Sequence, residues 1–247
     1  IVNIVTRLIK TPANTEEEAF RLRYIDAGLI AAPELATEQA TKEIIHFAKI
    51  SKNGLGYVRD AINVTDPEKF EEIRGKLVKY EEISDRIEYE IATFLNAASS
   101  HELSGDTSSL IKAMYKIVGE LESLGDSGEA ISRIIARKNI HNRTFSEETI
   151  KKLNNMVDLV EKAYDAMIFN LEATSEDRLD NIQNAYNAEE NLNVMRNNLR
   201  DEEIEKIDRN SDNYVTGVYF MDLINELERM GDFIINVSQD LLKYKLK

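Results

Sequence analysis

The sequence has 247 residues, of which 43% are hydrophobic, and its formal net charge is −14. A chain of this length can bury a substantial core, and its few Pro (3) and Gly (10) residues favour an all-α fold. The absence of Cys excludes disulfides, thiolate metal sites and thiol nucleophiles. The negative charge argues against nonspecific binding to nucleic acid or anionic lipid, and it suits a surface that binds cations or a basic partner.

The N-terminal part of the sequence is predicted to be a linker followed by a helical extension. Thr15 precedes three Glu residues, which is typical of a helix N-terminus because acidic side chains favour the positive end of the helix dipole. That helix would carry Leu22, Tyr24 and Ile25. Because the sequence does not begin with Met, we expect a further segment before it, with residues 1–14 as the tether.

Beyond this extension, segments with apolar residues three and four positions apart alternate with turn and cap signals, which predicts a series of long helices. The expected helices cover 34–64, 67–96, 106–139, 146–173, 176–207 and 212–242. They form two consecutive trios, which indicates an internal duplication, and short turns favour antiparallel packing within each trio. The expected domains are the N-terminal linker and extension (1–33), a first three-helix bundle (34–140) and a second three-helix bundle (141–247).

A seven-residue segment occurs twice, as Glu120–Asp126 and again as Glu226–Asp232, with a spacing of 226 − 120 = 106 residues. Five of the seven positions are identical: Glu, Leu, Glu, Gly and Asp. The second Glu and the Asp of each copy share one helix face, where like charges repel unless a cation lies between them. A Gly in the middle of a helix lowers helix stability by about 1 kcal/mol relative to Ala. This cost is tolerable where another backbone must come close. Two unfavourable choices repeated together predict a site.

The segment Glu226–Asp232, followed by Asn236 and Val237, resembles the third-helix signature of the PhoU family, and Glu120–Asp126 resembles its first-repeat counterpart. The segments 22–26, 32–36 and 38–40 are similar to the soluble C-terminal region that follows the membrane domain in bacterial sodium/phosphate cotransporters. The resemblance extends over nearly the whole chain.

This resemblance implies a two-bundle PhoU fold and a regulatory module of sodium-dependent phosphate uptake, without enzymatic activity, at the cytoplasmic face of the inner membrane. The implied partner is the membrane domain of the same polypeptide. A homo-oligomer is left open, and nucleic acid is not an expected partner.

Members of the PhoU family can bind multinuclear metal clusters through Glu/Asp-x-x-x-Asp motifs, so the resemblance also implies metal sites. The implied ligands are Glu81, Asp85, Glu122 and Asp126 in the first repeat and Glu189, Glu228 and Asp232 in the second. Carboxylate ligands suit Mg²⁺, Mn²⁺, Ca²⁺ or iron in an oxygen-rich site. The equivalent of Asp85 in the second repeat is Asn191 or Asn193, depending on the alignment. Since both are neutral amides, we expect the second site to be the weaker one.

Two other functions stay open from the residues. The first is a ferritin-like di-metal carboxylate enzyme, because Glu43 and His46 form a Glu-x-x-His unit that such bundles use twice. Neither of the other two His residues has a Glu three positions before it. The second is a metal-free helical scaffold whose acidic faces bind a partner protein. For Glu81 and Asp85 a further alternative to metal binding is neutralisation by Arg74 and Arg86. The sequence contains no nucleophile elbow and no Gly-rich phosphate loop.

Overall fold

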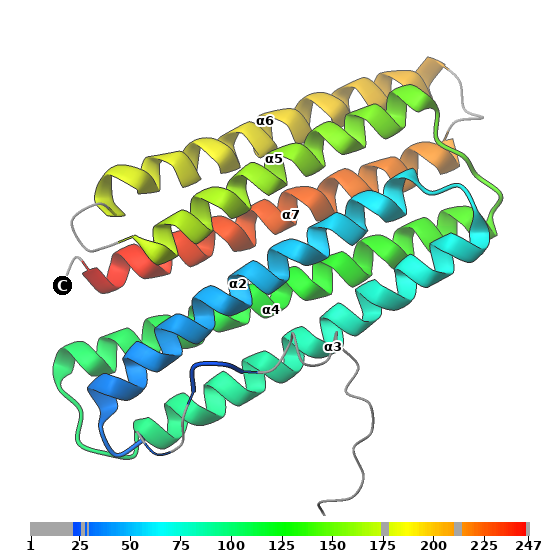
Figure 1. Ribbon diagram of the computed structural model, residues 1–247. Coiled ribbons are helices and arrows are strands. Elements are labelled where there is room, and N and C mark those ends of the chain that lie inside the picture. Colours follow the sequence, from blue (N-terminus) through cyan, green and yellow to red (C-terminus); the bar gives the residue numbers. More distant parts are fainter. Residues whose placement is uncertain (1–21, 26–27, 29, 174–177, 210–213, 246–247) are drawn as a thin grey trace, which may run out of the picture.

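The computed structural model describes residues 22–25, 28, 30–173, 178–209 and 214–245, and six helices account for nearly all of them (Figure 1). The helices are α2 (Pro33–Asn63), α3 (Pro67–Ala98), α4 (Gly105–Ile140), α5 (Glu147–Glu172), α6 (Arg178–Arg209) and α7 (Tyr214–Lys245). No strand occurs among these residues. The all-α prediction is confirmed, and each helix begins and ends within a few residues of its predicted bounds. None of the helices in the described part is long and apolar enough to cross a bilayer.

The helix starts follow the cap signals of the sequence. Asp66 accepts hydrogen bonds from two backbone N–H groups at the start of α3, and Ser104 and Ser146 each accept one at the starts of α4 and α5. Such caps satisfy N–H groups that have no partner inside the helix. Pro33 and Pro67 occupy first-turn positions, where the missing N–H group is not needed. Short capped turns therefore reverse the chain from α2 to α3, from α3 to α4 and from α4 to α5 (Figure 1).

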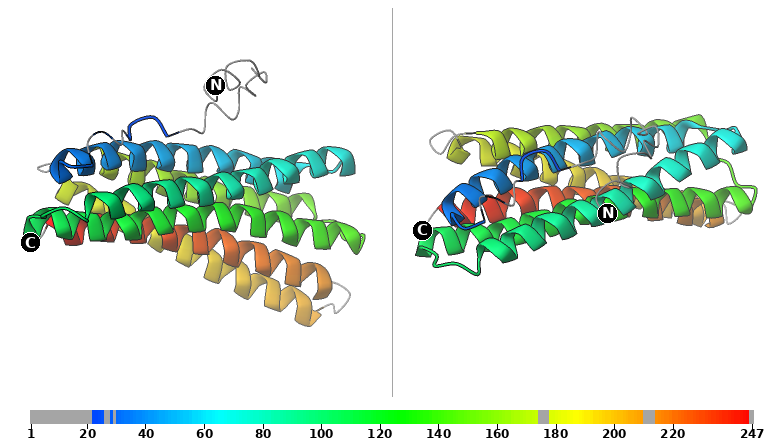
Figure 2. Two further views of the ribbon diagram at one scale, coloured as in Figure 1. Left: turned by 90° about the horizontal axis from the view of Figure 1, so that it is seen from below. Right: turned by 60° about the horizontal axis from the view of Figure 1, so that its bottom comes forward.

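The helices pack as two trios, α2–α3–α4 and α5–α6–α7, and within each trio every helix contacts the other two. The trios join where α4 packs on α7 and where α2 packs on α5. Two further views show all six helices extending along the same long direction (Figure 2). The predicted pair of consecutive three-helix bundles is confirmed. Buried side chains from both trios form one continuous core, and the division into separate domains stays a prediction.

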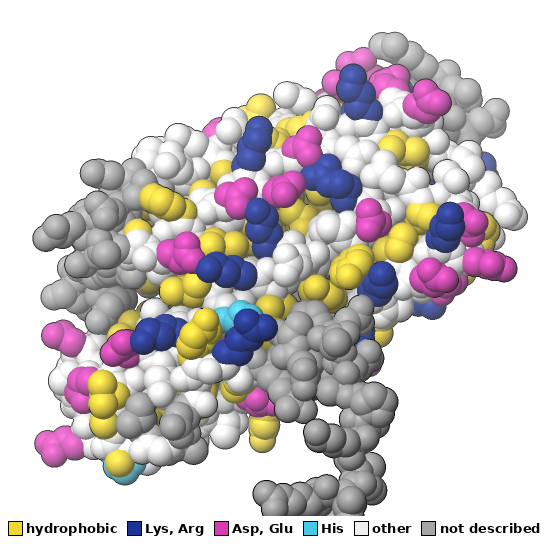
Figure 3. All heavy atoms as spheres, viewed as in Figure 1, with side chains coloured by type: hydrophobic (Ala, Val, Ile, Leu, Met, Phe, Trp, Pro, Cys, Tyr) yellow, Lys and Arg dark blue, Asp and Glu magenta, His cyan; other side chains and the backbone are white. Residues whose placement is uncertain are grey.

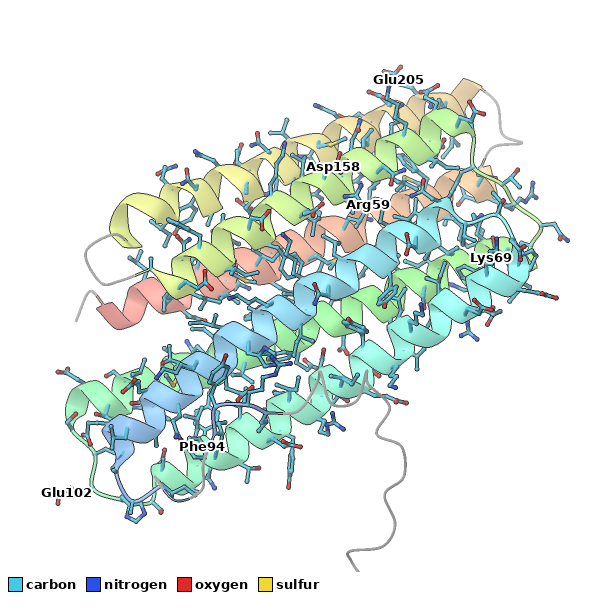
Figure 4. The ribbon with its side chains drawn as sticks, viewed as in Figure 1. Arg59, Lys69, Phe94, Glu102, Asp158 and Glu205 are labelled. Carbon is cyan, nitrogen blue, oxygen red and sulfur yellow. The ribbon has the colours of Figure 1, made fainter. Side chains whose placement is uncertain are left out.

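Polar side chains fix the join between α2 and α5. The Ser51 and Tyr164 hydroxyls share a hydrogen bond of 2.9 Å inside the core. At the surface, Arg59 forms ion pairs of 2.8 Å with Asp158 and 3.1 Å with Glu161. Basic and acidic side chains are interspersed over this face (Figure 3), and Arg59 and Asp158 are labelled on the two neighbouring helices (Figure 4). Exposed ion pairs add little stability, so their main effect is on how α2 and α5 are aligned along their length.

The join between α4 and α7 uses the first Glu of each repeated segment. Glu226 accepts a hydrogen bond of 2.7 Å from the Ser127 hydroxyl, and the Asn236 amide donates one of 3.1 Å to Glu120. The two segments therefore serve the same structural purpose in both trios. The second Glu and the Asp of each segment interact with charged residues of α3 in the first trio and of α6 in the second.

Residues 22–25 are not helical, contrary to the prediction for the N-terminal extension. Glu43 of α2 is only 1% exposed, and its carboxylate accepts the backbone N–H groups of Arg23 (2.8 Å) and Tyr24 (2.7 Å). A helical N–H would instead donate to the carbonyl four residues earlier. Leu22 and Ile25 pack against the core. The rest of the predicted N-terminal helix and the tether of residues 1–14 lie outside the described residues.

Candidate metal site

The four predicted ligands of the first repeat lie on the neighbouring helices α3 and α4. Glu81 and Asp85 of α3 and Asp126 of α4 each offer one carboxylate oxygen, and these three oxygens lie within 4.8 Å of one another. Glu122 lies one helical turn before Asp126 and is not part of this group of three. The structure thus brings three of the predicted ligands together, with the fourth beside them.

Gly125 allows α3 and α4 to approach closely at this site. A Cβ atom on Gly125 would lie 2.6 Å from the Ser84 Oγ and 2.9 Å from the Ser84 Cβ, and real Cβ atoms essentially never come so close. Ser84 precedes Asp85 and Gly125 precedes Asp126, so the close contact lies directly beside the two carboxylates. This explains why a helix-destabilising Gly occupies a mid-helix position.

The acidic side chains of this site form no ion pair with a basic side chain of the described residues. This holds for Glu81, Asp85, Glu88, Glu122 and Asp126. The two arginines that could have neutralised them are engaged elsewhere: Arg74 pairs with Glu71 at 2.8 Å, and Arg86 lies 4.0 Å from Glu90. The site therefore carries a concentrated negative charge.

Burial and mutual repulsion raise the pKa values of this group. Burial, followed by the charges of Asp126, Glu88 and Asp85, raises the pKa of Glu122 to about 7. Burial and then Asp85 raise the pKa of Asp126, against the opposing charges of two arginines. Burial and then Asp85 and Asp126 raise the pKa of Glu81. At roughly 5 Å, two like charges repel by about 1 kcal/mol in water and about 3 kcal/mol near a protein surface. A bound cation would remove this repulsion.

Glu88 belongs to the site but was not predicted from the sequence. Its charge contributes to the raised pKa of Glu122, and its Oε1 would lie 3.8 Å from a Cβ on Gly119 of α4. The signal that could have found it is the spacing of Glu81, Asp85 and Glu88. Residues four and then three positions apart lie on the same helix face.

The second repeat uses the same close contact between α6 and α7. A Cβ atom on Gly231 would lie 2.6 Å from the Cδ1 of Leu192. Gly231 follows Gly125 by 231 − 125 = 106 residues, whereas Leu192 follows Ser84 by 192 − 84 = 108 residues. The preceding helix of the second repeat is therefore shifted by two residues relative to the repeated segment.

This shift decides the alignment of the two repeats. The equivalent of Asp85 is Asn193 and not Asn191, because 85 + 108 = 193. The full set of equivalent pairs is Glu81 with Glu189, Asp85 with Asn193, Glu88 with Arg196, Glu122 with Glu228, and Asp126 with Asp232. Two of the five acidic positions of the first repeat are therefore an amide and a guanidinium in the second.

Two of the three predicted ligands of the second repeat, Glu228 and Glu189, are paired with these two side chains. The Arg196 Nη2 donates a hydrogen bond of 2.9 Å to the Glu228 Oε1, and the side chains are only 24% and 16% exposed. The Asn193 amide donates to Glu189. Burial raises the pKa values of Glu228 and Asp232, and the Arg196 charge opposes both shifts. In the part of the chain that the structure describes, these acids do not form a converging group like that of the first repeat.

The two side chains of the Glu-x-x-His unit, Glu43 and His46, contact the N-terminal segment of the described chain. Glu43 binds the backbone of residues 23–24, and the His46 ring packs edge-on against Tyr24 at a centroid distance of 6.1 Å. Burial is the main cause that lowers the pKa of His46. Neither side chain joins a group of three metal-ligating residues among those described, so this unit does not favour a di-metal enzyme.

Two solved structures of PhoU proteins share this architecture. PhoU from Pseudomonas aeruginosa aligns with a TM-score of 0.74 at 13% sequence identity, covering 85% of this chain and 97% of PhoU. The phosphate transport system regulatory protein PhoU from Streptococcus pneumoniae aligns with a TM-score of 0.70 at 14% identity, covering 86% and 96% of the two chains. A scan against models of protein families and a search of curated proteins both found no match. The predicted PhoU-like fold is confirmed.

Proposed function

We propose that this chain is a PhoU-like regulatory module of phosphate uptake that acts with the membrane domain of a sodium-dependent phosphate transporter. The observation that carries the proposal is the PhoU fold, which covers nearly the full length of two solved PhoU proteins. One of these is described as a phosphate transport system regulatory protein. The similarity of segments 22–26, 32–36 and 38–40 to the soluble region of sodium/phosphate cotransporters favours the transporter setting, at the cytoplasmic face of the inner membrane.

The proposed ligand of the module is a divalent or iron-type metal ion held by the first repeat. Glu81, Asp85 and Asp126 would hold it, since their oxygens lie within 4.8 Å of one another, and Glu122 and Glu88 would complete the acidic surroundings. An all-oxygen donor set with excess negative charge fits hard cations. When bound, the ion would supply the positive charge that these side chains lack.

Helix α4 connects this site with the other trio. Asp126 lies on α4, and α4 also forms the join with α7 through Ser127 and Glu120. Repulsion between the carboxylates opposes the close packing of α3 on α4 that Gly125 permits, and neutralisation would favour that packing. The proposed regulatory change is therefore a change in how α3 packs on α4, passed on through the α4–α7 join.

The regulatory role is tested by phosphate uptake in cells. Deletion of residues 33–245 from the encoded protein should change sodium-dependent uptake of radiolabelled phosphate, and Asp126→Asn in the intact protein should produce a smaller change in the same direction. Unchanged uptake in the deletion strain would overturn the regulatory role.

The metal function is tested on protein purified without chelator. Elemental analysis should find a bound divalent or iron-type ion in the wild-type protein and much less in Asp126→Asn. A protein that binds no ion, and whose stability does not respond to added Mn²⁺, Fe²⁺ or Ca²⁺, would instead support the metal-free scaffold.

A further inference from the structure

The five equivalent positions of the two repeats differ strongly in charge. In the first repeat all five are carboxylates, with a formal charge of −5. In the second repeat they are three carboxylates, one amide and one guanidinium, with a formal charge of −3 + 1 = −2. The difference lies at two positions of α6, where Asn193 and Arg196 replace the equivalents of Asp85 and Glu88.

Arg196 is positioned to neutralise the second acidic set. Its guanidinium donates to Glu228 at 2.9 Å, and its charge also acts on Asp232, one turn later on α7. The Arg196 Nε is buried without a hydrogen-bond partner among the described residues, so Glu228 supplies the hydrogen bond that holds the guanidinium. In the first repeat the equivalent acids, Glu122 and Asp126, form no ion pair within the same described ranges, although the charges of Arg133 and Arg229 act on Asp126.

We propose that the Arg196 guanidinium is a permanent built-in cation that takes the place of a metal ion in the second repeat. The packing of α6 on α7 is then independent of metal, whereas the packing of α3 on α4 responds to it. One trio serves as the ion-responsive part of the protein and the other as a fixed frame. This inference rests on the proposed metal function of the first repeat, which it restricts to that repeat.

The first experiment is done in chelator, so that the metal function plays no part. Arg196→Gln should lower the melting temperature by about 5 °C, because two partly buried carboxylates lose their cation. Arg196→Lys, which keeps the charge, should recover much of the loss. The matched control is Arg200→Gln, the same change one turn further along α6 at an exposed position, and it should have little effect. Equal effects of Arg196→Gln and Arg200→Gln would overturn the inference.

The second experiment converts the guanidinium-filled position into a metal site. Asn193→Asp with Arg196→Glu restores the acidic pattern of the first repeat, and Asp126→Asn in the same protein weakens the first site. Mn²⁺ should raise the melting temperature of this triple variant well above that of the Asp126→Asn single variant, and calorimetry should detect a binding event that the single variant lacks. If the triple variant is unfolded in chelator, Mn²⁺ should restore its helical circular dichroism.

The two proposals fail in different ways. A triple variant that binds no more Mn²⁺ than Asp126→Asn, while the wild-type protein does bind it, would overturn the inference about Arg196. A wild-type protein that binds no ion would overturn the proposed metal function. In that case the comparison of Arg196→Gln with Arg200→Gln, made in chelator, would still decide whether Arg196 neutralises the second acidic set.

Discussion

In the first repeat, Gly125 brings Asp126 close to Asp85 and Glu81, and nothing among the described residues pairs with these acids. In the second repeat, Gly231 allows the same close contact, but the facing helix supplies Arg196 to Glu228. The backbone geometry has thus been kept in both copies while the charge pattern has diverged. The difference teaches that a duplicated helix pair can retain its packing and still lose the electrostatic need for an external cation.

The largest expected effect is the response to metal. A ligand at about 100 times its Kd stabilises the folded state by about 2.7 kcal/mol, so Mn²⁺ added to chelator-treated protein should raise the melting temperature by several degrees. Asp126→Asn should remove most of this gain, whereas Asp232→Asn should leave most of it. Thermal unfolding of the three proteins with and without Mn²⁺ makes the comparison. Equal losses in the two variants would show that the repeats bind metal alike.

The next effect is a difference in size between Glu122→Gln and Glu228→Gln in chelator. The pKa of Glu122 is raised from 4.5 to about 7, so the folded state binds this proton more tightly than the unfolded state does. The stability that the protonated Glu122 side chain contributes is fully present below about pH 4.5, and it is lost as the pH rises through about 7. Glu122→Gln should therefore stabilise the protein by a few degrees at about pH 8 and flatten the pH dependence between these limits.

Glu228→Gln should have a smaller effect of the same sign. Burial also raises the pKa of Glu228, but the charge of Arg196 opposes that shift, and a Gln side chain can still accept the hydrogen bond from Arg196. The urea midpoint at about pH 8 should therefore rise less for Glu228→Gln than for Glu122→Gln. An equal or larger rise for Glu228→Gln would contradict the assignment of Arg196 to the second site alone.

Much of this architecture could be predicted because it depends on local signals. Apolar spacing and caps such as Asp66 and Ser104 define each helix within the chain itself, and the repeated segment marks α4 and α7 as equivalent. The non-helical segment at residues 22–25 could not be predicted in this way, because its backbone N–H groups bind Glu43, which lies about twenty residues further along. A contact of that range leaves no periodicity in the sequence.

The acids of the first repeat could be predicted as a group shared by two neighbouring helices, whereas the alignment of the second repeat could not be decided. The spacing of Glu81 with Asp85, and of Glu122 with Asp126, is visible in the sequence because each pair shares one helix face. To recognise Arg196 as the equivalent of Glu88, one must know how the sequence of α6 aligns with that of α3. That alignment uses a spacing of 108 residues, whereas the repeated segment has a spacing of 106. Only the contact of Gly231 with Leu192 fixes that alignment.

A smaller effect is expected from the two close-packing glycines. Gly125→Ala should destabilise the protein by about 1 kcal/mol, since overpacking against the backbone-proximal Ser84 Cβ outweighs the gain in helix propensity. Gly231→Ala should be nearly neutral, because its closest neighbour is the Cδ1 end of the flexible Leu192 side chain. Urea unfolding of both variants measures the difference. A larger loss for Gly231→Ala would mean that the second helix pair is the more tightly packed one.

The smallest expected effect separates charge from packing at the equivalent positions 85 and 193. In chelator, Asp85→Asn should stabilise the protein by about 0.5 kcal/mol, because it removes one of several converging charges near the surface. Asn193→Asp should destabilise it by about as much, since the amide that donates to Glu189 becomes a like charge, while Arg196 limits the loss. Asp201→Asn, at an exposed position of α6, is the matched control and should change little.

In saturating Mn²⁺ the change in stability caused by Asp85→Asn should reverse its sign, because the same substitution then removes a metal ligand. The change caused by Asn193→Asp should keep its sign. Urea midpoints measured under both conditions give all of these signs, and an unchanged sign for Asp85→Asn would mean that this carboxylate takes no part in holding the ion.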